Sequence, residues 1–351
     1  MPESAVPGDR AVIDVQGVSR TFVLRRRTGW MRRERSDIHA VADLSFAVRA
    51  GEMVGYLGPN GAGKSTTIKM LVGILTPSGG RLRVAGLDPS RQRLQLARRI
   101  GVVFGQRSAL WPDLPLRDSF ELVHRIYRIP PRRYRQNLDA FIDLLAMAPF
   151  LDTPVRQLSL GQRMRGGIAA AFLPDPEIVY LDEPTIGLDV VSKAAVRSFL
   201  ERTNREQGTT VLLTTHDMSD VEQLCRRVMV IDHGRLGFDG DLEELRTRLG
   251  GVRTLRVDLA EALPEMSVDG ARVVRVEGAR QWLEFPTGAS AAPLISEIAA
   301  RYPLVDLTVG EPAIEQIIAR LYTTDRLPLP AGGDVTTGGD VTTGGEVTAG
   351  G

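Results

Sequence analysis

One segment of the chain has the residue types and spacing of a phosphate-binding loop. Gly58–Ser65 reads GPNGAGKS, a full match to the pattern GxxxxGK followed by Ser or Thr. The glycines let the backbone turn so that successive N–H groups face phosphate oxygens, and a helix that follows adds its partly positive N-terminus. We expect Lys64 to reach the β- and γ-phosphates and the Ser65 hydroxyl to ligate Mg²⁺. The ATP-binding residues predicted here are Gly58, Pro59, Asn60, Gly61, Ala62, Gly63, Lys64, Ser65 and Thr66.

Two adjacent carboxylates follow an apolar run further along the chain. Ile178–Glu183 reads IVYLDE, which is typical of a strand with acidic residues at its C-terminal end. Asp182 is predicted to hold Mg²⁺ directly or through water, while Glu183 points the opposite way and polarises the attacking water as a general base. Such a pair alone is a weak signal, because strands often end in an acidic residue that caps a helix. Downstream of a phosphate loop, it indicates ATP hydrolysis.

Short apolar runs between helical stretches must position these residues. Met53–Leu57 (MVGYL) precedes the phosphate loop, and Ile100–Phe104, Ile178–Leu181 and Thr210–Thr214 are similar, which is typical of buried parallel strands. Strands that alternate with helices predict an α/β fold, a phosphate-loop NTPase domain with a mixed, mostly parallel sheet flanked by helices. The predicted helices are Thr66–Leu75, Arg91–Arg99, Ser119–Ile126, Tyr134–Leu145 and Gln162–Phe172.

A basic stretch separates two further predicted strands, Ala11–Val23 and Val41–Arg49. Leu24–Asp37 carries six arginines around Trp30. Short runs of like charge are usually solvated, so one interpretation is a solvated hairpin loop. The other interpretation is a contact with anionic headgroups or with a partner chain. The sequence leaves both open.

The pattern of predicted strands and helices changes after about Leu249. We predict an N-terminal tail at residues 1–10, an ATPase domain at 11–249 with a helical subdomain at about 107–172, a small α+β extension at 250–325 and a tail at 326–351. The tail repeats GGDVTT, GGDVTT and GGEVTA, and its dense glycine and low hydrophobicity predict disorder. The elements expected in the extension are strands at Thr254–Leu259, Val273–Glu277 and Trp282–Phe285 and helices at Ala292–Ala300 and Ala313–Leu321.

Composition excludes several classes of protein. The 351 residues are 43% hydrophobic and 25% charged, which is ordinary for a globular protein. The net charge of +1 gives no strong global field, so no nucleic-acid partner is expected. Cys225 is the one cysteine, which excludes an intrachain disulfide. No signal peptide and no run of about 18 apolar residues is visible, so we expect a separate chain to supply any membrane-spanning part.

Six motifs, in their order along the chain, resemble those of the nucleotide-binding subunits of ABC transporters. They are GPNGAGKS, Gln106, LSLGQ at Leu158–Gln162, IVYLDEP, GLD at Gly187–Asp189 and TTHD at Thr214–Asp217. The resemblance covers about Ala11–Leu249 and implies an ATPase that uses ATP and Mg²⁺. In one departure, Leu160 replaces a glycine of the usual signature LSGGQ. Since Ser159 and Gly161 are kept, contact with phosphate is expected to survive.

The resemblance also implies roles for single residues. Phe22 matches the aromatic residue that stacks on adenine, although a core aromatic on a strand is the alternative. Gln106 matches the glutamine that senses Mg²⁺ and the γ-phosphate and links to the transmembrane partner. Asp189 matches a loop residue that crosses the dimer interface, and His216 matches the switch histidine that contacts the γ-phosphate and acts in catalysis. The signature residues expected to close over the γ-phosphate of the opposite protomer are Ser159, Gly161 and Gln162.

For the whole protein, the resemblance implies two ATPase subunits, in a homodimer or a heterodimer, that sandwich ATP and drive separate integral membrane permease chains. Gln106–Tyr127 is expected to receive the permease, with Trp111, Pro112 and Pro115 as a stiff docking site; an ordinary linker is the alternative. The stretch resembles a subgroup of type-2 exporters related to drug-resistance ATPases. We therefore expect export of drug-like or envelope-derived compounds, with the chain bound at the cytoplasmic face of the membrane through its permease and soluble in the cytoplasm when alone.

Two rival functions are weighed against transport. A soluble ABC ATPase that acts on ribosomes or DNA would carry a second phosphate loop or long zinc or coiled-coil insertions, and the sequence has neither a second loop nor a CxxC pair. A non-catalytic nucleotide-binding regulator is disfavoured because Glu183 and His216 are both present.

Overall fold

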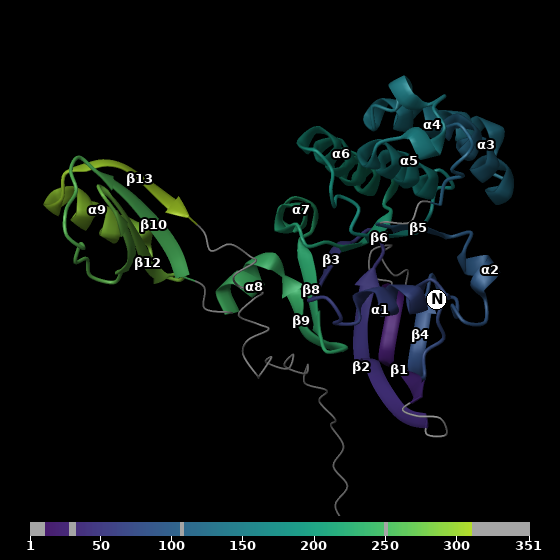
Figure 1. The fold of residues 1–351 in the computed structure, drawn as a ribbon, viewed down its shortest axis with the longest axis horizontal. Coiled ribbons are helices and arrows are strands. Elements are labelled where there is room, and N and C mark those ends of the chain that lie inside the picture. Colours follow the sequence, from purple (N-terminus) through teal and green to yellow (C-terminus); the bar gives the residue numbers. More distant parts are fainter. Residues whose placement is uncertain (1–10, 28–32, 106–108, 249–251, 311–351) are drawn as a thin grey trace, which may run out of the picture.

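The computed structural model describes residues 11–27, 33–105, 109–248 and 252–310, and gives only the backbone of residues 24–27, 33–36 and 247–248. Three sheets form within these ranges. Two of them belong to the part of the chain before Arg248, and the third belongs to a C-terminal unit (Figure 1).

A six-stranded sheet is the framework of the N-terminal part. Its strand order is β5-β6-β7-β3-β8-β9. Every neighbouring pair is parallel except β8 and β9, which are antiparallel. The predicted mixed, mostly parallel sheet is thus confirmed, and three of the four short apolar runs keep the predicted bounds. The strands are β3 (Met53–Leu57), β5 (Ile100–Phe104), β6 (Ile178–Asp182), β7 (Thr210–Thr214), β8 (Arg227–Asp232) and β9 (Arg235–Asp241).

Successive residues of the central strands enter two different cores. Along β6, Val179 and Leu181 join the cluster that contains the helical part of the molecule, whereas Ile178 and Tyr180 join the cluster on the opposite face. All four side chains are fully buried. Because both faces of the sheet are covered, a strand in it is apolar at every position instead of at every second one.

A three-stranded antiparallel sheet, in the order β2-β1-β4, completes the core of the second face. Its strands are β1 (Ala11–Arg27), β2 (Arg33–Arg49) and β4 (Gly79–Val84). The prediction of a loop over Leu24–Asp37 is wrong for most of that stretch, because Leu24 pairs with Ser36 and Arg27 with Arg33. Backbone pairing continues from the well-packed part of the hairpin, and charged side chains do not by themselves end such a ladder. Residues 28–32 lie outside the described ranges.

Three predicted helices are found in the helical part. They are α3 (Leu116–Tyr127), α4 (Pro131–Leu144) and α5 (Leu160–Phe172), each starting two or three residues before its predicted start. Pro131 stands at the first turn of α4, where a missing N–H costs nothing. Helix α5 begins directly after Ser159, which caps it.

Two helices are shorter than predicted. Helix α1 spans Lys64–Leu71, so it begins inside the phosphate loop and ends before Gly73, whose φ of 75° is left-handed. Helix α2 spans only Arg93–Leu96, and the remaining residues of the predicted Arg91–Arg99 helix form turns and a bend.

Several elements were not predicted. Helix α6 has apolar or small buried residues at 196, 199, 200 and 203, a helical spacing that could have identified it. Strands β8 and β9 and the strand β4 were also missed. The remaining helices of this part are α6 (Val190–Gln207), α7 (Met218–Leu224) and α8 (Leu242–Arg248).

The C-terminal unit is a four-stranded antiparallel sheet, in the order β11-β12-β10-β13, with one described helix and its own apolar cluster. It confirms the predicted strands and the first predicted helix, and adds β13. The predicted helix Ala313–Leu321 and the tail lie outside the described residues. The elements are β10 (Val252–Leu259), β11 (Arg272–Glu277), β12 (Arg280–Pro286), α9 (Ala291–Arg301) and β13 (Leu304–Gly310).

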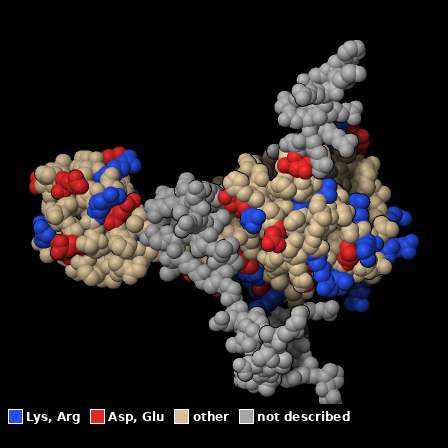
Figure 2. All heavy atoms as spheres, turned by 90° about the horizontal axis from the view of Figure 1, so that it is seen from below, with Lys and Arg blue, Asp and Glu red and all other residues tan. Residues whose placement is uncertain are grey.

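The near-neutral total charge is unevenly distributed over the surface. Figure 2 shows basic side chains gathered on the side of the larger body where β4 and α2 lie in Figure 1. The exposed arginines of these segments are Arg81, Arg83, Arg91, Arg93 and Arg98. The surface is therefore locally basic although the chain as a whole carries a formal charge of only +1.

Candidate nucleotide site

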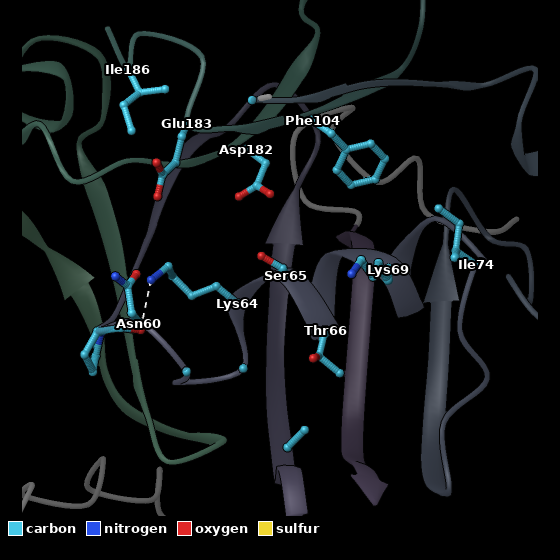
Figure 3. A pocket seen from close by; sticks show the side chains of 15 residues that line it. Asn60, Lys64, Ser65, Thr66, Lys69, Ile74, Phe104, Asp182, Glu183 and Ile186 are labelled. Atoms are coloured by element: carbon cyan, nitrogen blue, oxygen red, sulfur yellow. Dashed lines mark hydrogen bonds between the residues drawn. The ribbon is translucent and has the colours of Figure 1, made fainter. Parts of the chain in front are cut away.

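A cavity of about 590 Å³ lies where β3, β5 and β6 end (Figure 3). Parallel strands place their C-terminal ends at one edge of the sheet, so segments far apart in sequence meet there. The cavity is lined by Ala40, Pro59, Asn60, Gly61, Gly63, Lys64, Ser65, Thr66, Lys69, Ile74, Phe104, Gly105, Asp182, Glu183 and Ile186. The phosphate loop and the two adjacent carboxylates therefore share one cavity.

The course of the phosphate loop requires glycine at two positions. Gly63 has a φ of 105°, and a Cβ there would lie 2.5 Å from the Ala40 carbonyl oxygen. A Cβ on Gly58 would lie 2.4 Å from the Ile231 carbonyl oxygen. The loop thus lies close against the backbone of β2 and of β8, and α1 starts directly after Gly63 with its N-terminus at the cavity.

Lys64 is held inside the loop. Its side chain is almost completely buried, and Nζ donates hydrogen bonds to the carbonyl oxygens of Gly58 and, at 3.0 Å, of Pro59. Burial lowers the pKa of the Lys64 ammonium below its usual value, while the negative charges of Glu183 and Asp182 act in the opposite direction. Figure 3 shows the ammonium directed toward the space between the loop and the two carboxylates.

Asp182 and Ser65 are the oxygen donors that could hold Mg²⁺. Both line the cavity, and Asp182 Oδ1 accepts a hydrogen bond of 2.6 Å from Thr214 Oγ1 at the end of β7. Among the described residues, no group of three or more His, Cys, Asp and Glu side chains could hold a metal ion. Mg²⁺ commonly uses one or two protein ligands together with waters and substrate phosphates, so one carboxylate and one hydroxyl fit this ion.

Glu183 and His216 meet at the ends of adjacent strands. Glu183 follows β6 with a φ of 54°, and its backbone N–H donates to the Thr214 carbonyl oxygen at 2.9 Å. His216 Nε2 lies 2.9 Å from Glu183 Oε1. A side chain that can accept a proton is thus paired with an imidazole beside the cavity, although His216 itself does not line it.

The signature residues lie apart from this cavity. Ser159 caps α5: its Oγ accepts from the Gln162 N–H at 3.2 Å, and its own N–H donates to Gln162 Oε1 at 2.9 Å. A Cβ on Gly161 would lie 3.0 Å from Ser192 Oγ, so α5 and α6 are in close contact here. None of these residues lines the cavity.

Asp189 caps α6 beside the signature. Its carboxylate accepts from the Ser192 N–H at 2.9 Å and from Ser192 Oγ at 2.8 Å. The bond from the Ser192 N–H, followed by the bond from its hydroxyl, lowers the pKa of Asp189. The carboxylate therefore has a local structural partner, in addition to the interface role that the sequence predicted for it.

Further predicted residues are not placed in the cavity. Gly58 and Ala62 belong to the phosphate loop but do not line the cavity. Phe22 does not line the cavity; its ring faces the guanidinium of Arg20, whose Cζ lies 4.8 Å from the ring centroid. Gln106 lies outside the described residues.

Sequence reasoning missed several lining residues. Phe104 is the clearest, because it pairs in register with Asp182 across β5 and β6. Its position as the last residue of a predicted strand was a partial signal, but the order of the strands, which brings it beside Asp182, was not visible in the sequence. The other lining residues that were not predicted are Ala40, Lys69, Ile74, Gly105 and Ile186.

Comparison with known proteins agrees with the fold and the site. The sequence model of the family described as "ABC transporter" matches residues 41–186. The chain is 34% identical over 301 residues to the daunorubicin resistance ATP-binding protein DrrA3 of Streptomyces coeruleorubidus, covering 83% of this chain and 93% of that protein. It is 35% identical over 267 residues to the Nod factor export ATP-binding protein I of Ralstonia nicotianae, covering 72% of this chain and 78% of that protein.

A solved structure supports the same assignment. It is described as the dimeric, post-hydrolysis state of the ATP-binding cassette MJ0796 bound to ADP and Pi, and it matches with a TM-score of 0.55 at 26% identity, covering 66% of this chain and 98% of that one. The fold and the cavity define a phosphate-loop ATPase. The chain belongs to the ABC transporter family, as an ATP-binding subunit that hydrolyses ATP. Within the described ranges, no helix combines the length and hydropathy that a bilayer crossing requires.

Proposed function

We propose that this chain powers an exporter of drug-like or envelope-derived compounds, by coupling the ATP-driven pairing of two ATPase subunits to separate permease chains. The observation that carries the proposal is the division of the predicted site. Lys64, Ser65, Asp182 and Glu183 line one cavity, whereas Ser159 and Gly161 lie outside it. A γ-phosphate bound by one chain can then contact Ser159 and Gly161 of a second chain.

In the proposed chemistry, the chain's own residues bind the nucleotide and orient the attacking water. Backbone N–H groups of Gly61 and Gly63 and the Lys64 ammonium bind the β- and γ-phosphates. Ser65 and Asp182 would hold Mg²⁺, which would supply positive charge to the phosphate oxygens. Glu183 accepts the proton of the attacking water, and His216 keeps the carboxylate oriented. Most of the catalysis is positioning and charge stabilisation.

Pairing of two chains would complete both sites. Ser159 presents a helix N-terminus of α5, and such a terminus favours an anion. When the γ-phosphate leaves, the link between the subunits is lost and the pair opens, which gives the two states that a transporter needs. A solved relative described as dimeric and bound to ADP and Pi supports this proposal.

The permease is proposed to dock on the segment that follows Gln106. Its described part is held rigidly: the backbone N–H of Val155 donates to the Leu114 carbonyl at 3.0 Å, and that of Arg156 donates to the Pro112 carbonyl at 2.9 Å. Trp111 remains partly exposed on this loop, and Ile126 is exposed at the end of α3. A stiff loop with apolar side chains in solvent suits a protein partner, and docking would place the chain at the cytoplasmic face of the membrane.

Export of drug-like or envelope-derived compounds is proposed from the relatives. One relative is described as a daunorubicin resistance protein and another as a Nod factor export protein. The first name describes resistance to an organic compound and the second describes export of one, and the chain spans most of the length of each relative.

Co-purification and transport test the proposal. The tagged protein, isolated from detergent-solubilised membranes of its own cells, should recover an integral membrane chain, and vesicles that contain both should accumulate a fluorescent anthracycline when ATP is added. The Glu183→Gln variant should abolish accumulation while the complex stays intact. Recovery of ribosomes or DNA in place of a membrane chain would overturn the transport role.

A further inference from the structure

A buried carboxylate is hydrogen-bonded to residues that neighbour Glu183 and His216 in the chain. Asp220, on α7, has no exposed surface. Its Oδ2 accepts a hydrogen bond from the Thr185 hydroxyl and a longer one, of 3.4 Å, from Thr215 Oγ1. Thr185 comes two residues after Glu183, and Thr215 comes directly before His216. One oxygen atom therefore joins the loop that carries Glu183 to the loop that carries His216.

The second oxygen of this carboxylate is bound from a third element. Arg197, on α6, donates from Nε to Asp220 Oδ1 at 2.6 Å. The remaining guanidinium nitrogens bind the α7 side chains Ser219, at 2.6 Å, and Gln223, at 3.1 Å. Both carboxylate oxygens are thus occupied, which is what a charge without solvent requires.

Stability alone does not explain a charge pair at this place. Replacing a buried ion pair with apolar side chains of similar volume is often neutral or stabilising, because desolvation offsets the attraction. The hydrogen bonds of Asp220 are directional and reach three elements. They can therefore fix the distance between the loops that they join, which apolar packing does not do.

A second contact holds the same helices together. Lys193, four residues before Arg197 on α6, donates from Nζ to Asp217 Oδ2 at 2.5 Å. The Asp217 N–H in turn donates to Thr215 Oγ1 at 3.0 Å. Helix α6 therefore holds the segment on both sides of His216, and Asp220 is the point where this support reaches Thr185.

We propose that Asp220 is a positioning residue, which fixes the distance between the loops of Glu183 and His216 and so maintains their 2.9 Å contact. The inference rests on the proposed roles of Glu183 and His216 in hydrolysis. A general base must lie within hydrogen-bond reach of its water. Without the bond to Thr185, the loop of Glu183 gains freedom, and without the bond to Thr215, the loop of His216 does.

Paired substitutions at Thr185 test this role without removing a buried charge. Thr185→Val keeps the shape and loses the hydroxyl, whereas Thr185→Ser keeps the hydroxyl. We expect Thr185→Val to lower kcat on the order of ten- to a hundredfold, as a small misplacement of catalytic groups does, with unchanged affinity for ATP. Thr185→Ser should restore kcat. Thr203→Val, a matched change at a buried threonine of α6, should leave kcat unaltered.

A double-mutant cycle separates positioning from a general effect on folding. Asp220→Asn should lower kcat in the wild-type background, and should lower it no further in a His216→Ala background, because the relationship that it maintains is already lost. Equal losses in both backgrounds, or a normal kcat in Thr185→Val, would overturn the proposal. Should Asp220→Asn fail to fold, the Thr185 pair decides alone. A wild-type protein that neither recovers a membrane chain nor drives accumulation would overturn the proposed function, whereas its kcat could still test Asp220.

Discussion

His216 Nε2 contacts Glu183 Oε1 at 2.9 Å, across the ends of two strands that pair in parallel register, β6 and β7. The two residues are 33 positions apart in the chain (216 − 183 = 33) and follow their strands closely. One oxygen of the carboxylate contacts the imidazole, which leaves the other for the proposed role of taking a proton from water. Substitutions at either residue should therefore affect hydrolysis more than binding.

Glu183→Gln is the most direct test of the general base. The amide keeps the size of the side chain but cannot accept a proton, so kcat should fall roughly a hundredfold or more, while ATP still binds. Because the γ-phosphate then persists, the variant should elute as a dimer in ATP during size-exclusion chromatography.

The matched control for this variant lies at the other end of the same strand, just before it begins. Glu177 directly precedes β6 and pairs with Arg99 at 2.5 Å, far along the strand from the cavity. Glu177→Gln should hydrolyse ATP normally and elute as the wild type does. Wild-type turnover in Glu183→Gln would contradict the role assigned to that carboxylate.

Lys64→Ala should weaken the binding of ATP. The loss of a charged donor to the phosphates should raise Kd roughly ten- to a hundredfold, measured by titration with a fluorescent ATP analogue. Lys64→Arg should not restore binding, because a planar guanidinium does not fit where the compact ammonium is enclosed by the loop carbonyls. AMP is the ligand control: it lacks the β- and γ-phosphates, so its affinity should be the same for wild type and variants.

Asp217 gives a prediction for the pH dependence of stability. Burial raises the pKa of this carboxyl, but bonds from Lys193 and Ser219 outweigh burial and lower the pKa to about 2. In the unfolded chain it returns to about 4. A depressed folded pKa contributes stability that is fully present above pH about 4 and is lost as the pH falls toward 2. Asp217→Asn, which keeps a good helix cap, should lower the free energy of unfolding by roughly 2 kcal/mol at neutral pH.

Urea unfolding at a series of pH values checks this. The difference in free energy of unfolding between wild type and Asp217→Asn should become smaller as the pH falls from about 4 to about 2. Asp113→Asn is the control, because Asp113 and its partner Arg156 are 79% and 64% exposed, and exposed pairs contribute little. A difference that is independent of pH would show that the ion pair is not its cause.

Gly187 and Leu160 provide a test of the contact between the signature and the loop after Glu183. Gly187 has a φ of 68°, and a Cβ there would lie 2.9 Å from Leu160 Cδ2. Gly187→Ala should therefore lower the free energy of unfolding by roughly 1–2 kcal/mol through backbone strain. The steric conflict with Leu160 should lower it further. Gly208→Ala isolates the strain, since Gly208 has a φ of 67° and no neighbour within 4 Å of a Cβ. Gly187→Ala should lower the free energy of unfolding more than Gly208→Ala does. This difference should disappear in a Leu160→Ala background.

Much of the site follows from local sequence. The phosphate loop was recognised from its glycine spacing and its lysine, which reflect contacts within a few positions of the chain. Most of its residues line the cavity, and their binding of ATP stays a prediction. Asp182 was placed in the same cavity as Ser65 because strands ending at one edge of a parallel sheet bring their last residues together. The short strands were found because burial on both faces leaves an uninterrupted apolar run between turn signals.

The parts that were missed depend on which elements become neighbours. Phe104 lines the cavity because β5 lies beside β6, an order that local residues do not encode. Asp220 connects α6, α7 and the loop after β6, and nothing in its own surroundings in the sequence distinguishes it from a solvated helix residue. The hairpin of β1 and β2 extends through arginines because pairing with an already formed partner overrides local charge. The adenine contact of Phe22 stays a prediction.

The left-handed backbone of Glu183, with a φ of 54°, has a consequence for how far this protein can be stabilised. A residue with a Cβ in that conformation lowers the stability of the folded protein by roughly 1–2 kcal/mol, and a glycine there would remove most of this strain. Glu183→Gly should then melt at a higher temperature than the wild type while losing hydrolysis. A search for thermostable variants by melting temperature alone would select against the carboxylate proposed to act in catalysis, so such a screen needs turnover as its second criterion.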